Sequence, residues 1–456
     1  MFEQEFILKS TTCELITSKT ISNFNGISID SRRIMPGDLY IAIKGENFDG
    51  HDFINEAFEK GANGVILEYI PADLNLNREK TVIKVSSTVE ALGNIANAWR
   101  NRFEKLKVVC ITGSNGKTTT KEITASILSV KKKVLKNSGN FNNHVGLPLT
   151  LLKLDDNFDI CVAEIGMNDF GEIRYLTDIA EPDVGVITNI GRAHLEKLQT
   201  LEGVAKAKGE LVEKFGKNNC FIVNMDDPYI SDIASDLDCK KVCYSLENKG
   251  FDIYAENLKN NGLESISFTL VINNETVNTR IRGIGTHNVM NALCASGIAY
   301  SLGYSRDEIR EGIERYSPIY MRLEIIETPQ GFKIINDSYN ANPDSMSNAL
   351  KELSKLKNDN NLIAVLGDML ELGSSSSDEH RKIGEYIKNL NIDFVITYGN
   401  DSKYINKEVE GNIDNIHVET HQEAAKYLIE KAKDKDFVLL KGSRGMKMEN
   451  TIKFLY

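Results

Sequence analysis

A short segment, residues 107–120, combines the groups that bind nucleotide phosphates. It reads Lys-Val-Val-Cys-Ile-Thr-Gly-Ser-Asn-Gly-Lys-Thr-Thr-Thr, with an apolar run before the glycines and a helix-compatible segment, 121–130, after them. Glycines let backbone N–H groups turn toward phosphate oxygens, and the N-terminus of the following helix adds positive potential. The lysine can reach the outer phosphates, and the hydroxyl beside it can hold Mg²⁺. The predicted nucleotide-binding residues are Gly113, Ser114, Asn115, Gly116, Lys117, Thr118 and Thr119.

This loop is shorter than the common phosphate-binding loop. Gly113 stands three residues before Gly116, whereas G-x-x-x-x-G-K-[ST] places its glycines five apart. A G-x-x-G-K sequence alone also fits an ordinary turn between a strand and a helix. The preceding strand, the following helix and the threonines at 118–120 favour nucleotide binding.

Polar groups also follow the next apolar runs. The run 160–163 ends on Glu164, the run 186–190 is followed by His194, and Lys208 lies in a helix-compatible segment beyond it. Ligands of open α/β sheets gather at the carboxyl ends of strands, and a carboxylate there is a typical Mg²⁺ ligand. Taken singly, Glu164 could be a solvated acid, His194 a capping or core histidine, and Lys208 a surface lysine. Only together do they favour a catalytic site.

The composition narrows the class of protein. The 456 residues are 41% hydrophobic and 26% charged, which is typical of a globular chain of about two or three domains. The net charge of −11 argues against nucleic-acid binding. We find no signal peptide and no run of about 20 apolar residues, so we expect no membrane insertion. The seven cysteines are scattered, without a Cys-x-x-Cys pair, which favours the reduced cytoplasm.

Three stretches differ in their patterning. Residues 1–85 contain short strands and one helix, and the turn Asp30-Ser31-Arg32 could be a solvated turn or a binding element. Residues 86–317 alternate strand and helix, which predicts a mostly parallel sheet, while the period-two pattern at 251–282 predicts an antiparallel addition. Residues 318–456 restart the alternation and predict a second, Rossmann-like unit. The expected fold class is α/β with three domains.

The phosphate loop, Glu164, His194 and Lys208 together resemble the Mur ligases of bacterial cell-wall synthesis. The segments 287–292, 321–324 and 336–338 are similar to the family's adenine-contacting helix and to its hinge arginine and aspartate. The resemblance covers nearly the whole chain, in the family's three-domain order. It is greatest to the branch that adds D-Ala-D-Ala to UDP-MurNAc-tripeptide, through the runs 139–148, 164–168, 337–346, 366–373 and 441–446.

The resemblance implies roles for individual residues. Further ATP contacts would be Asn288, Asn291, Arg322 and Asp337, and metal ligands would be Thr118, Glu164, His194 and Lys208, the last carbamylated, with Lys206 as its nearest competitor. The UDP-sugar and peptide would contact Ser31, Arg32, Asn140, Asn142 and Asn143, and the amine would contact Asn340 and Asn342. Departures from the pattern are small: Ser138 stands where we expect threonine, and Arg192 occupies a variable position.

The implied reaction is ATP-driven amide formation through an acyl phosphate, with ATP and Mg²⁺ required and a monomer expected. We weigh four alternatives: a sibling ligase that adds a single amino acid, a folylpolyglutamate synthetase, a phosphate-loop ATPase switch, and a non-catalytic scaffold. The run 340–344 and the complete N-terminal domain disfavour the first two, and an intact set of Lys117, Glu164, His194 and Lys208 disfavours the others. The third residue of the acceptor peptide, lysine or diaminopimelate, stays open.

Overall fold

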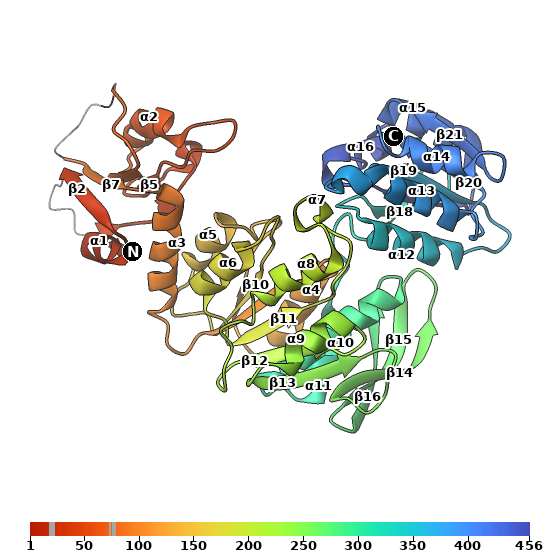
Figure 1. Ribbon diagram of the computed structural model, residues 1–456, viewed down its shortest axis with the longest axis horizontal. Helices are drawn as coiled ribbons and strands as arrows, with labels where there is room; N and C mark the ends of the chain where they lie inside the picture. Colours follow the sequence, from red (N-terminus) through yellow and green to blue (C-terminus); the bar gives the residue numbers. More distant parts are fainter. Residues whose placement is uncertain (18–22, 73, 75–78) are drawn as a thin grey trace. The chain divides into compact units, whose positions relative to one another are not determined.

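The computed structural model describes residues 1–17, 23–72, 74 and 79–456 and has an α/β fold (Figure 1). By their contacts these residues form two compact units. The first comprises 1–108, 135–165 and 174–182, and the second comprises 109–134, 166–173 and 183–456. The domain boundaries expected at 85/86 and 317/318 stay predictions.

The N-terminal part of the first unit is built on a small mixed sheet. Its elements are β1 (Phe2–Glu3), α1 (Gln4–Ser10), β2 (Cys13–Thr17), β3 (Asn23–Phe24), β4 (Ile27–Ser28), η1 (Ser31–Arg33), β5 (Leu39–Ile41), η2 (Gly50–Phe53), α2 (Ile54–Glu59), β6 (Gly64–Leu67), β7 (Thr81–Val85) and α3 (Thr88–Arg100). The sheet has the order β2-β7-β6-β5-β4, and only the β2–β7 pair is antiparallel. The one helix expected in residues 1–85 is present as η2 and α2, but that expectation was incomplete, because α1 is a second helix in the same stretch.

The central sheet carries the phosphate loop. Its strands have the order β16-β15-β14-β13-β12-β11-β8-β10-β9. They are β8 (Lys107–Thr112), β9 (Val134–Lys136), β10 (Ile160–Glu164), β11 (Val184–Ile187), β12 (Cys220–Asn224), β13 (Lys240–Ser245), β14 (Ile253–Asn260), β15 (Ser265–Ile272) and β16 (Glu275–Arg282). The pairs β14–β15 and β15–β16 are antiparallel, so the expected antiparallel addition is confirmed.

The register of two central strands positions the site. Strands β8 and β11 are parallel, and Ile187 at the end of β11 is paired with Thr112 at the end of β8. The loops that follow them therefore leave the same edge of the sheet. The helices of this region are α4 (Lys117–Leu128), α5 (Gly146–Leu151), α6 (Glu172–Ala180), α7 (Leu195–Leu198), α8 (Leu201–Gly209), α9 (Pro228–Ser235), α10 (Thr286–Ser301) and α11 (Arg306–Arg315).

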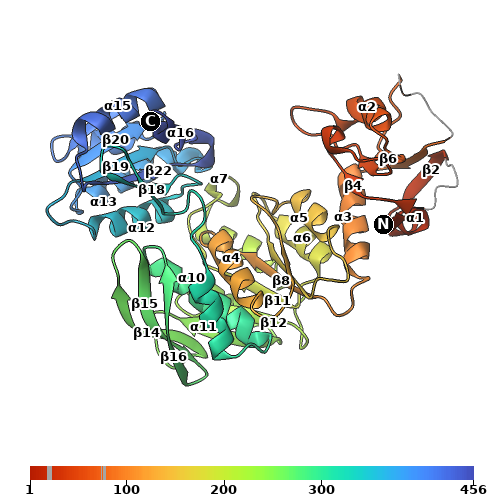
Figure 2. The ribbon, with the colours of Figure 1, turned by 180° about the vertical axis from the view of Figure 1, so that it is seen from behind.

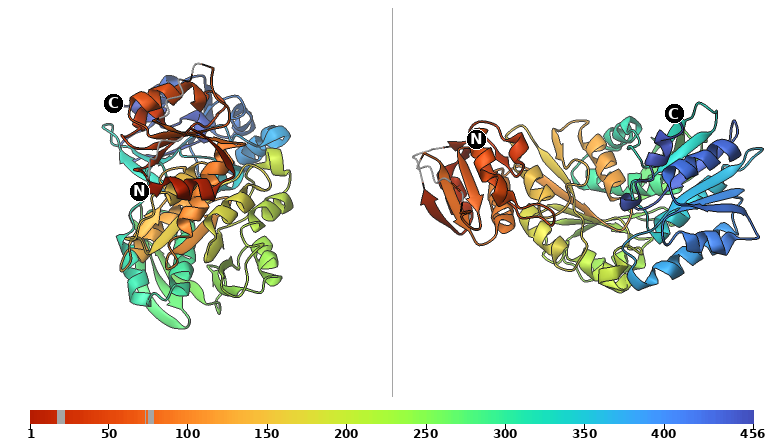
Figure 3. Two further views of the ribbon diagram at one scale, coloured as in Figure 1. Left: turned by 90° about the vertical axis from the view of Figure 1, so that its left-hand side faces the viewer. Right: turned by 90° about the horizontal axis from the view of Figure 1, so that it is seen from above.

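The C-terminal part of the second unit is a second sheet with helices on both faces (Figures 2 and 3). The strand order is β17-β18-β22-β19-β20-β21, parallel except for the β17–β18 pair. One core contains residues of α12, α13 and α14, and a second core contains residues of α15. The elements are β17 (Glu324–Glu327), β18 (Lys333–Asp337), α12 (Pro343–Ser354), β19 (Leu362–Gly367), η3 (Gly373–Ser375), α13 (Ser376–Ile387), β20 (Phe394–Tyr398), α14 (Lys403–Val409), β21 (Asp414–Val418), α15 (His421–Lys431), β22 (Phe437–Lys441), η4 (Arg444–Met446) and α16 (Asn450–Lys453).

Candidate functional site

The phosphate loop lies between the buried strand β8 and helix α4, as the sequence predicts. Its two glycines are required by space and by conformation. Gly113 has a φ of 142°, and a Cβ there would collide with the hydroxyl of Thr188. Gly116 has a φ of 79°, and a Cβ there would lie 2.5 Å from Oδ1 of Asn291. The loop can therefore keep this shape only with glycine at both positions.

The loop that follows β11 holds the phosphate loop in place. Asn189 accepts a hydrogen bond from the Asn115 backbone N–H at 3.0 Å and donates its amide to the Asn115 carbonyl at 2.9 Å. The Ser114 hydroxyl donates to the Gly191 carbonyl at 3.0 Å and accepts from the Gly191 N–H at 2.8 Å. These reciprocal bonds mean that a shift of either loop would displace the other.

Lys117 is folded back over its own loop. Its ammonium donates to the Gly113 carbonyl at 2.7 Å and to the Ser114 carbonyl at 3.3 Å. An ammonium in this position can exchange carbonyl oxygens for phosphate oxygens, because both are hydrogen-bond acceptors.

Lys208 is buried at the end of α8, with 1% of its surface exposed. Burial, and next the positive charge of Lys117, hold the pKa of Lys208 well below its ordinary value. Lys206 differs, because it is exposed and its ammonium lies 6.0 Å from the centre of the Phe170 ring. The surroundings of Lys208 therefore disfavour its charged form.

His194 immediately precedes α7 and has a left-handed backbone, with a φ of 56°. Its Nδ1 atom lies 2.7 Å from Oε2 of Glu371, which belongs to the loop after β19. The bond from His194 holds the pKa of Glu371 below its ordinary value. A second contact joins the same segments, because the Glu196 N–H donates to the Glu371 carbonyl at 3.2 Å.

Glu164 lies at the end of β10 in the first unit and is 3% exposed. Its Oε1 accepts a hydrogen bond from the Asn142 amide at 2.9 Å, and Asn137 bonds to its backbone N–H and carbonyl. Its Oε2 is buried without a hydrogen-bond partner among the described residues. A buried carboxylate oxygen in this condition is suited to a cation. The predicted proximity of Glu164 to the phosphate loop stays a prediction.

The other predicted acceptor-binding asparagines lie near Asn142. Asn143 accepts backbone N–H groups of Val145 and Gly146 at 3.2 and 2.9 Å, so it shapes the turn into α5. Asn140 is exposed.

Arg322 of the C-terminal segment reaches the nucleotide-binding region, whereas the contact of Asp337 lies within its own segment. Arg322 donates to the hydroxyl of Thr118 at 3.1 Å, and its guanidinium lies 4.2 Å from the centre of the Tyr339 ring. Asp337 is paired with the buried Lys441 at 2.5 Å. Sequence reasoning noted the run 441–446 but gave Lys441 no role; its position at the end of a buried strand was the available signal.

The predicted adenine-contacting asparagines lie at the start of α10. Asn291 accepts a hydrogen bond from the Thr120 hydroxyl at 3.3 Å and lies beside Gly116. Asn288 donates its amide to the Ile284 carbonyl at 2.8 Å. The structure thus brings Asn291, but not the Asn288 amide, into contact with the loop–helix segment that would hold the phosphates.

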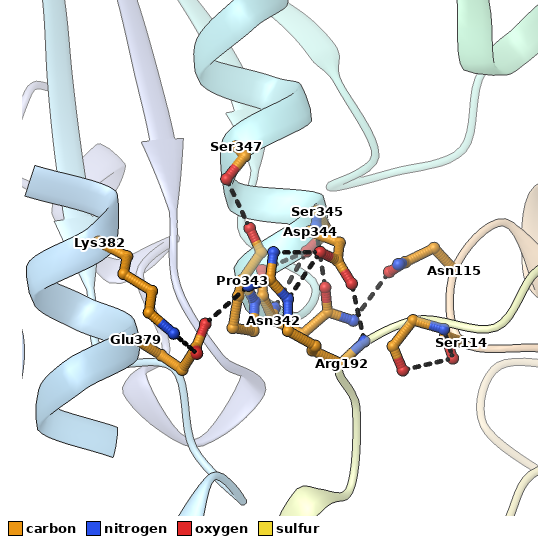
Figure 4. A network of polar contacts seen from close by, with 11 residues as sticks. Ser114, Asn115, Arg192, Asn342, Pro343, Asp344, Ser345, Ser347, Glu379 and Lys382 are labelled. Carbon is orange, nitrogen blue, oxygen red and sulfur yellow. Dashed lines mark hydrogen bonds and ion pairs between the residues drawn. The ribbon is translucent and has the colours of Figure 1, made fainter. Parts of the chain in front are cut away.

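The two asparagines predicted to bind the amine differ in their contacts. Asn342 caps α12, since its Oδ1 accepts the Ser345 N–H at 2.8 Å, and its amide donates to Oδ1 of Asn115 at 2.9 Å (Figure 4). Asn340 is exposed, and its Oδ1 accepts the Arg444 N–H at 3.3 Å. Asn342 therefore has a structural task in addition to the predicted one.

Family models match three segments of this chain, and curated proteins match most of its length. The family models that match are "Mur ligase family, catalytic domain" at residues 23–100, "Mur ligase middle domain" at 111–299 and "Mur ligase, glutamate ligase domain" at 321–444. The UDP-N-acetylmuramoyl-tripeptide--D-alanyl-D-alanine ligase of Bacillus subtilis is 36% identical over 94% of this chain and 93% of its own length. The Escherichia coli protein of the same name is 34% identical over 94% and 93%.

The chain belongs to the Mur ligase family.

Solved structures agree with this membership. MurF from Acinetobacter baumannii superposes with a TM-score of 0.91 at 31% identity, over 100% of this chain and 98% of that one. The Thermotoga maritima MurF ligase, solved in complex with ADP, has a TM-score of 0.84 at 28% identity, over 94% and 96%. The three-domain α/β Mur ligase fold predicted from the sequence is therefore confirmed.

In this Mur ligase the predicted UDP-sugar residues lie on η1. The Ser31 hydroxyl is turned inward and donates to Glu56 at 3.0 Å. Arg32 donates to both carboxylate oxygens of Asp30, at 2.9 and 3.0 Å, and its side chain is 82% exposed. Of the two, only the arginine is directed to solvent.

The described residues of this Mur ligase contain neither a membrane-spanning helix nor a cluster of metal-binding side chains of the usual types. Across residues 1–17, 23–72, 74 and 79–456, no helix is long and apolar enough to cross a membrane. The same residues contain no group of three His, Cys, Asp or Glu side chains that could hold a metal ion. The predicted ligand set includes only Glu164 and His194 of these types, so it depends on Thr118 and on a modified Lys208.

Proposed function

We propose that this chain is an ATP-dependent ligase that joins D-alanyl-D-alanine to the terminal carboxylate of UDP-N-acetylmuramoyl-tripeptide. The observation that carries the proposal is its 36% identity, over 94% of the chain, to the Bacillus subtilis ligase with that name. The similarity extends through all three family-model segments, so it includes the regions expected to bind the nucleotide, the acceptor and the amine.

The proposed reaction has two steps. A carboxylate is a poor electrophile, so the acceptor's carboxylate oxygen first attacks the γ-phosphorus of ATP, and the bond from phosphorus to ADP breaks. The free amine of the dipeptide then attacks the carbonyl carbon of the acyl phosphate, loses a proton and expels inorganic phosphate. Catalysis of the first step consists mainly of positioning and charge stabilisation.

Lys117 and Arg322 would supply the positive charge for phosphoryl transfer. Lys117 already binds two loop carbonyls, and rotation of its side chain would carry the ammonium to the β- and γ-phosphates. Arg322 contacts Thr118 at 3.1 Å, so its guanidinium lies at the start of the helix that follows the phosphate loop. The same step would use Asn288, Asn291 and Asp337 around the nucleotide.

Thr118 and Glu164 would hold one Mg²⁺ ion, and His194 and Lys208 would hold a second. When bound, the two ions would neutralise charge on the phosphates. The buried, unpaired Oε2 of Glu164 supports its place in this set. The buried amine of Lys208 supports carbamylation: the nitrogen lone pair adds to the carbon of CO₂, a proton is lost, and an anionic oxygen ligand results. The exposed Lys206 has no such surroundings.

The remaining proposed contacts concern the two other substrates. The UDP-sugar and its peptide would contact Ser31, Arg32, Asn140, Asn142 and Asn143, and the dipeptide would contact Asn340 and Asn342. We further propose that the enzyme acts in the cytoplasm as a monomer.

Amine-dependent phosphate release tests the proposal. The purified chain is incubated with ATP, Mg²⁺ and UDP-MurNAc-tripeptide, in its lysine and diaminopimelate forms, and with one amine at a time. We expect phosphate release with D-Ala-D-Ala at least about 100-fold faster than with D-Ala, L-Lys or diaminopimelate, since an unfilled polar subsite is strongly disfavoured. Faster release with a single amino acid would instead support a sibling ligase.

A further inference from the structure

The loop after β11 is joined to the C-terminal segment through one arginine. Arg192 donates its backbone N–H to Oδ2 of Asp344 at 2.7 Å, and its Nε and Nη2 donate to Oδ1 at 3.0 and 2.7 Å. Its Nη1 donates to Oε2 of Glu379 at 3.2 Å. Figure 4 shows the guanidinium between the start of α12, which carries Asp344, and α13, which carries Glu379.

The residues next to Arg192 and Asp344 also contact the phosphate loop. Gly191, next to Arg192, exchanges two hydrogen bonds with Ser114, and Asn115 accepts the amide of Asn342 at 2.9 Å. A Cβ on Gly191 would lie 2.8 Å from Oδ2 of Asp344. The first residues of α12 thus contact both loops at the carboxyl edge of the central sheet.

The ionic contacts differ from an ordinary surface pair. Exposed ion pairs contribute little, unless the geometry is bidentate or several charges form a network. Here one guanidinium contacts two carboxylates, and the Glu379 side chain is only 7% exposed. The other oxygen of Glu379 accepts from Lys382 at 2.7 Å. Removing Arg192 would take away the positive charge beside Asp344 and leave Glu379 with Lys382.

A simpler explanation accounts for part of this arrangement. An acidic residue in the first turn of a helix is favourable by itself, and Asp344 occupies that position in α12. That explanation does not account for Arg192, which is 152 positions from Asp344 in the sequence and binds its carboxylate with both backbone and side chain. It also leaves out Glu379, which lies on a different helix.

We propose that Arg192, Asp344 and Glu379 form a latch that positions the C-terminal segment on the nucleotide-binding loops while the incoming amine attacks. Arg192 is a positioning residue, since it acts through α12 and not on the reacting atoms. This role rests on the proposed ligase function. With the latch opened, the acyl phosphate is exposed to water, which attacks the carbonyl and regenerates the carboxylate with release of phosphate. When the latch is open, phosphate is therefore released without formation of an equal amount of amide.

The test compares Arg192→Ala, Arg192→Lys and Asp344→Asn with Arg381→Ala. Arg381 is a matched control because it forms an exposed pair with Asp378 at 2.9 Å on the same helix, α13. The first readout is the ratio of amide formed to phosphate released. We expect a ratio near one for the wild type and the control, and a drop of at least about threefold for Arg192→Ala, with a raised KM for the dipeptide and little change in the KM for ATP. Arg192→Lys keeps the charge but not the planar group whose Nε and Nη2 both donate to Oδ1 of Asp344, so its ratio should lie between those of the wild type and Arg192→Ala.

A second readout needs no substrate. Small-angle X-ray scattering of the free protein should give a larger radius of gyration for Arg192→Ala than for the wild type and Arg381→Ala at low salt. Added salt should bring the wild type toward the variant, because the latch is partly exposed and screened. Circular dichroism confirms that each variant is folded.

The outcomes separate the latch from the proposed function. Expansion of Arg192→Ala in a protein that ligates another amine would support the latch and contradict the proposed substrate. Unchanged scattering with a wild-type ratio of amide to phosphate would overturn the latch and leave the ligase function standing. Equal effects of Arg192→Ala and Arg381→Ala would also overturn it.

Discussion

The surroundings of the buried Lys208 amine, with the ammonium of Lys117 among them, disfavour its charged form. Burial contributes most, and the charge of Lys117 adds to it, so the pKa of Lys208 is well below its ordinary value. A neutral amine keeps the lone pair that addition to CO₂ requires, and the carbamate so formed would carry a negative charge toward Lys117. The position of Lys208 near Lys117 therefore provides a physical reason for the carbamylation of Lys208 that family resemblance implies.

Lys208→Ala should therefore remove nearly all activity, and a small carboxylic acid should restore part of it. The expected loss is about 100-fold or more, as for other groups that stabilise charge in a transition state. Acetate or formate in the buffer can occupy the vacated space and offer the missing oxygen ligand. Phosphate-release rates with and without the acid provide the measurement, and Lys206→Ala, which changes an exposed lysine, should behave like the wild type. Rescue by a primary amine but not by acids would mean that Lys208 acts as a cation.

Lys117→Ala should lower kcat by about 100-fold or more and leave the fold intact, since its charge contributes mainly in the transition state. Steady-state kinetics and circular dichroism give the two measurements. Lys132→Ala, at an exposed position just beyond α4, is the control for general loss of charge. A folded Lys117→Ala variant with more than about a tenth of the wild-type rate would contradict the phosphate-binding role.

Asn342→Ala should affect both stability and substrate use. Loss of the α12 cap costs about 1 kcal/mol, a figure typical of N-cap residues. Ser305→Ala removes a comparable capping box from α11 and should lower the melting temperature to a similar extent without changing any KM. If Asn342 also binds the amine, its variant should raise the KM for D-Ala-D-Ala far more than the KM for ATP.

Asn340→Ala isolates the binding role, because Asn340 is exposed and caps no helix. We expect a raised KM for the dipeptide with a normal melting temperature. An unchanged KM for the dipeptide would remove Asn340 from the amine site, whereas equal effects on ATP and the dipeptide would indicate a general loss of domain closure.

Asp49 makes the first unit sensitive to acid. Burial alone would raise the pKa of Asp49, but hydrogen bonds from His51 and Tyr69 outweigh it and lower the pKa to about 2. A carboxyl whose pKa is depressed by folding stabilises the protein above its unfolded value of about 3.9, and this contribution is lost as the pH falls through the folded value. The melting temperature of the wild type should therefore fall more steeply between about pH 4 and pH 2 than that of Asp49→Asn. Parallel curves, or the same effect in the exposed control Asp52→Asn, would contradict this assignment.

Local patterns predicted most of the architecture. Strand β8 was predicted from the β-branched run 108–111, and the antiparallel hairpin was predicted from the period-two pattern near 265–270. Both signals lie in residues that are adjacent in the sequence. The short strand β17 was missed, because four residues without clear alternation carry little signal. Burial of Lys208 was also beyond local reasoning, since a lysine in a polar helix ordinarily faces solvent.

Contacts between distant segments could not be predicted from single residues. Arg322 and Thr118 are 204 positions apart, and Arg192 and Asp344 are 152 apart. Both pairs depend on how the C-terminal sheet is placed against the nucleotide-binding loops. Periodicity in neighbouring residues does not predict that placement. Glu371 was likewise missed as a partner of His194, because its position depends on a left-handed backbone, with a φ of 64°, in the loop after β19.

A competition experiment tests the central proposal most directly. The chain is incubated with ATP, Mg²⁺ and UDP-MurNAc-tripeptide in an equimolar mixture of D-Ala-D-Ala, D-Ala, L-Lys and diaminopimelate, and the nucleotide-linked product is weighed by mass spectrometry. We predict a single product whose added mass is that of the dipeptide less one water, formed in equal amount to the phosphate released. A product carrying one amino acid, or ATP hydrolysis without any new amide, would contradict the assignment of this chain as a D-alanyl-D-alanine-adding ligase.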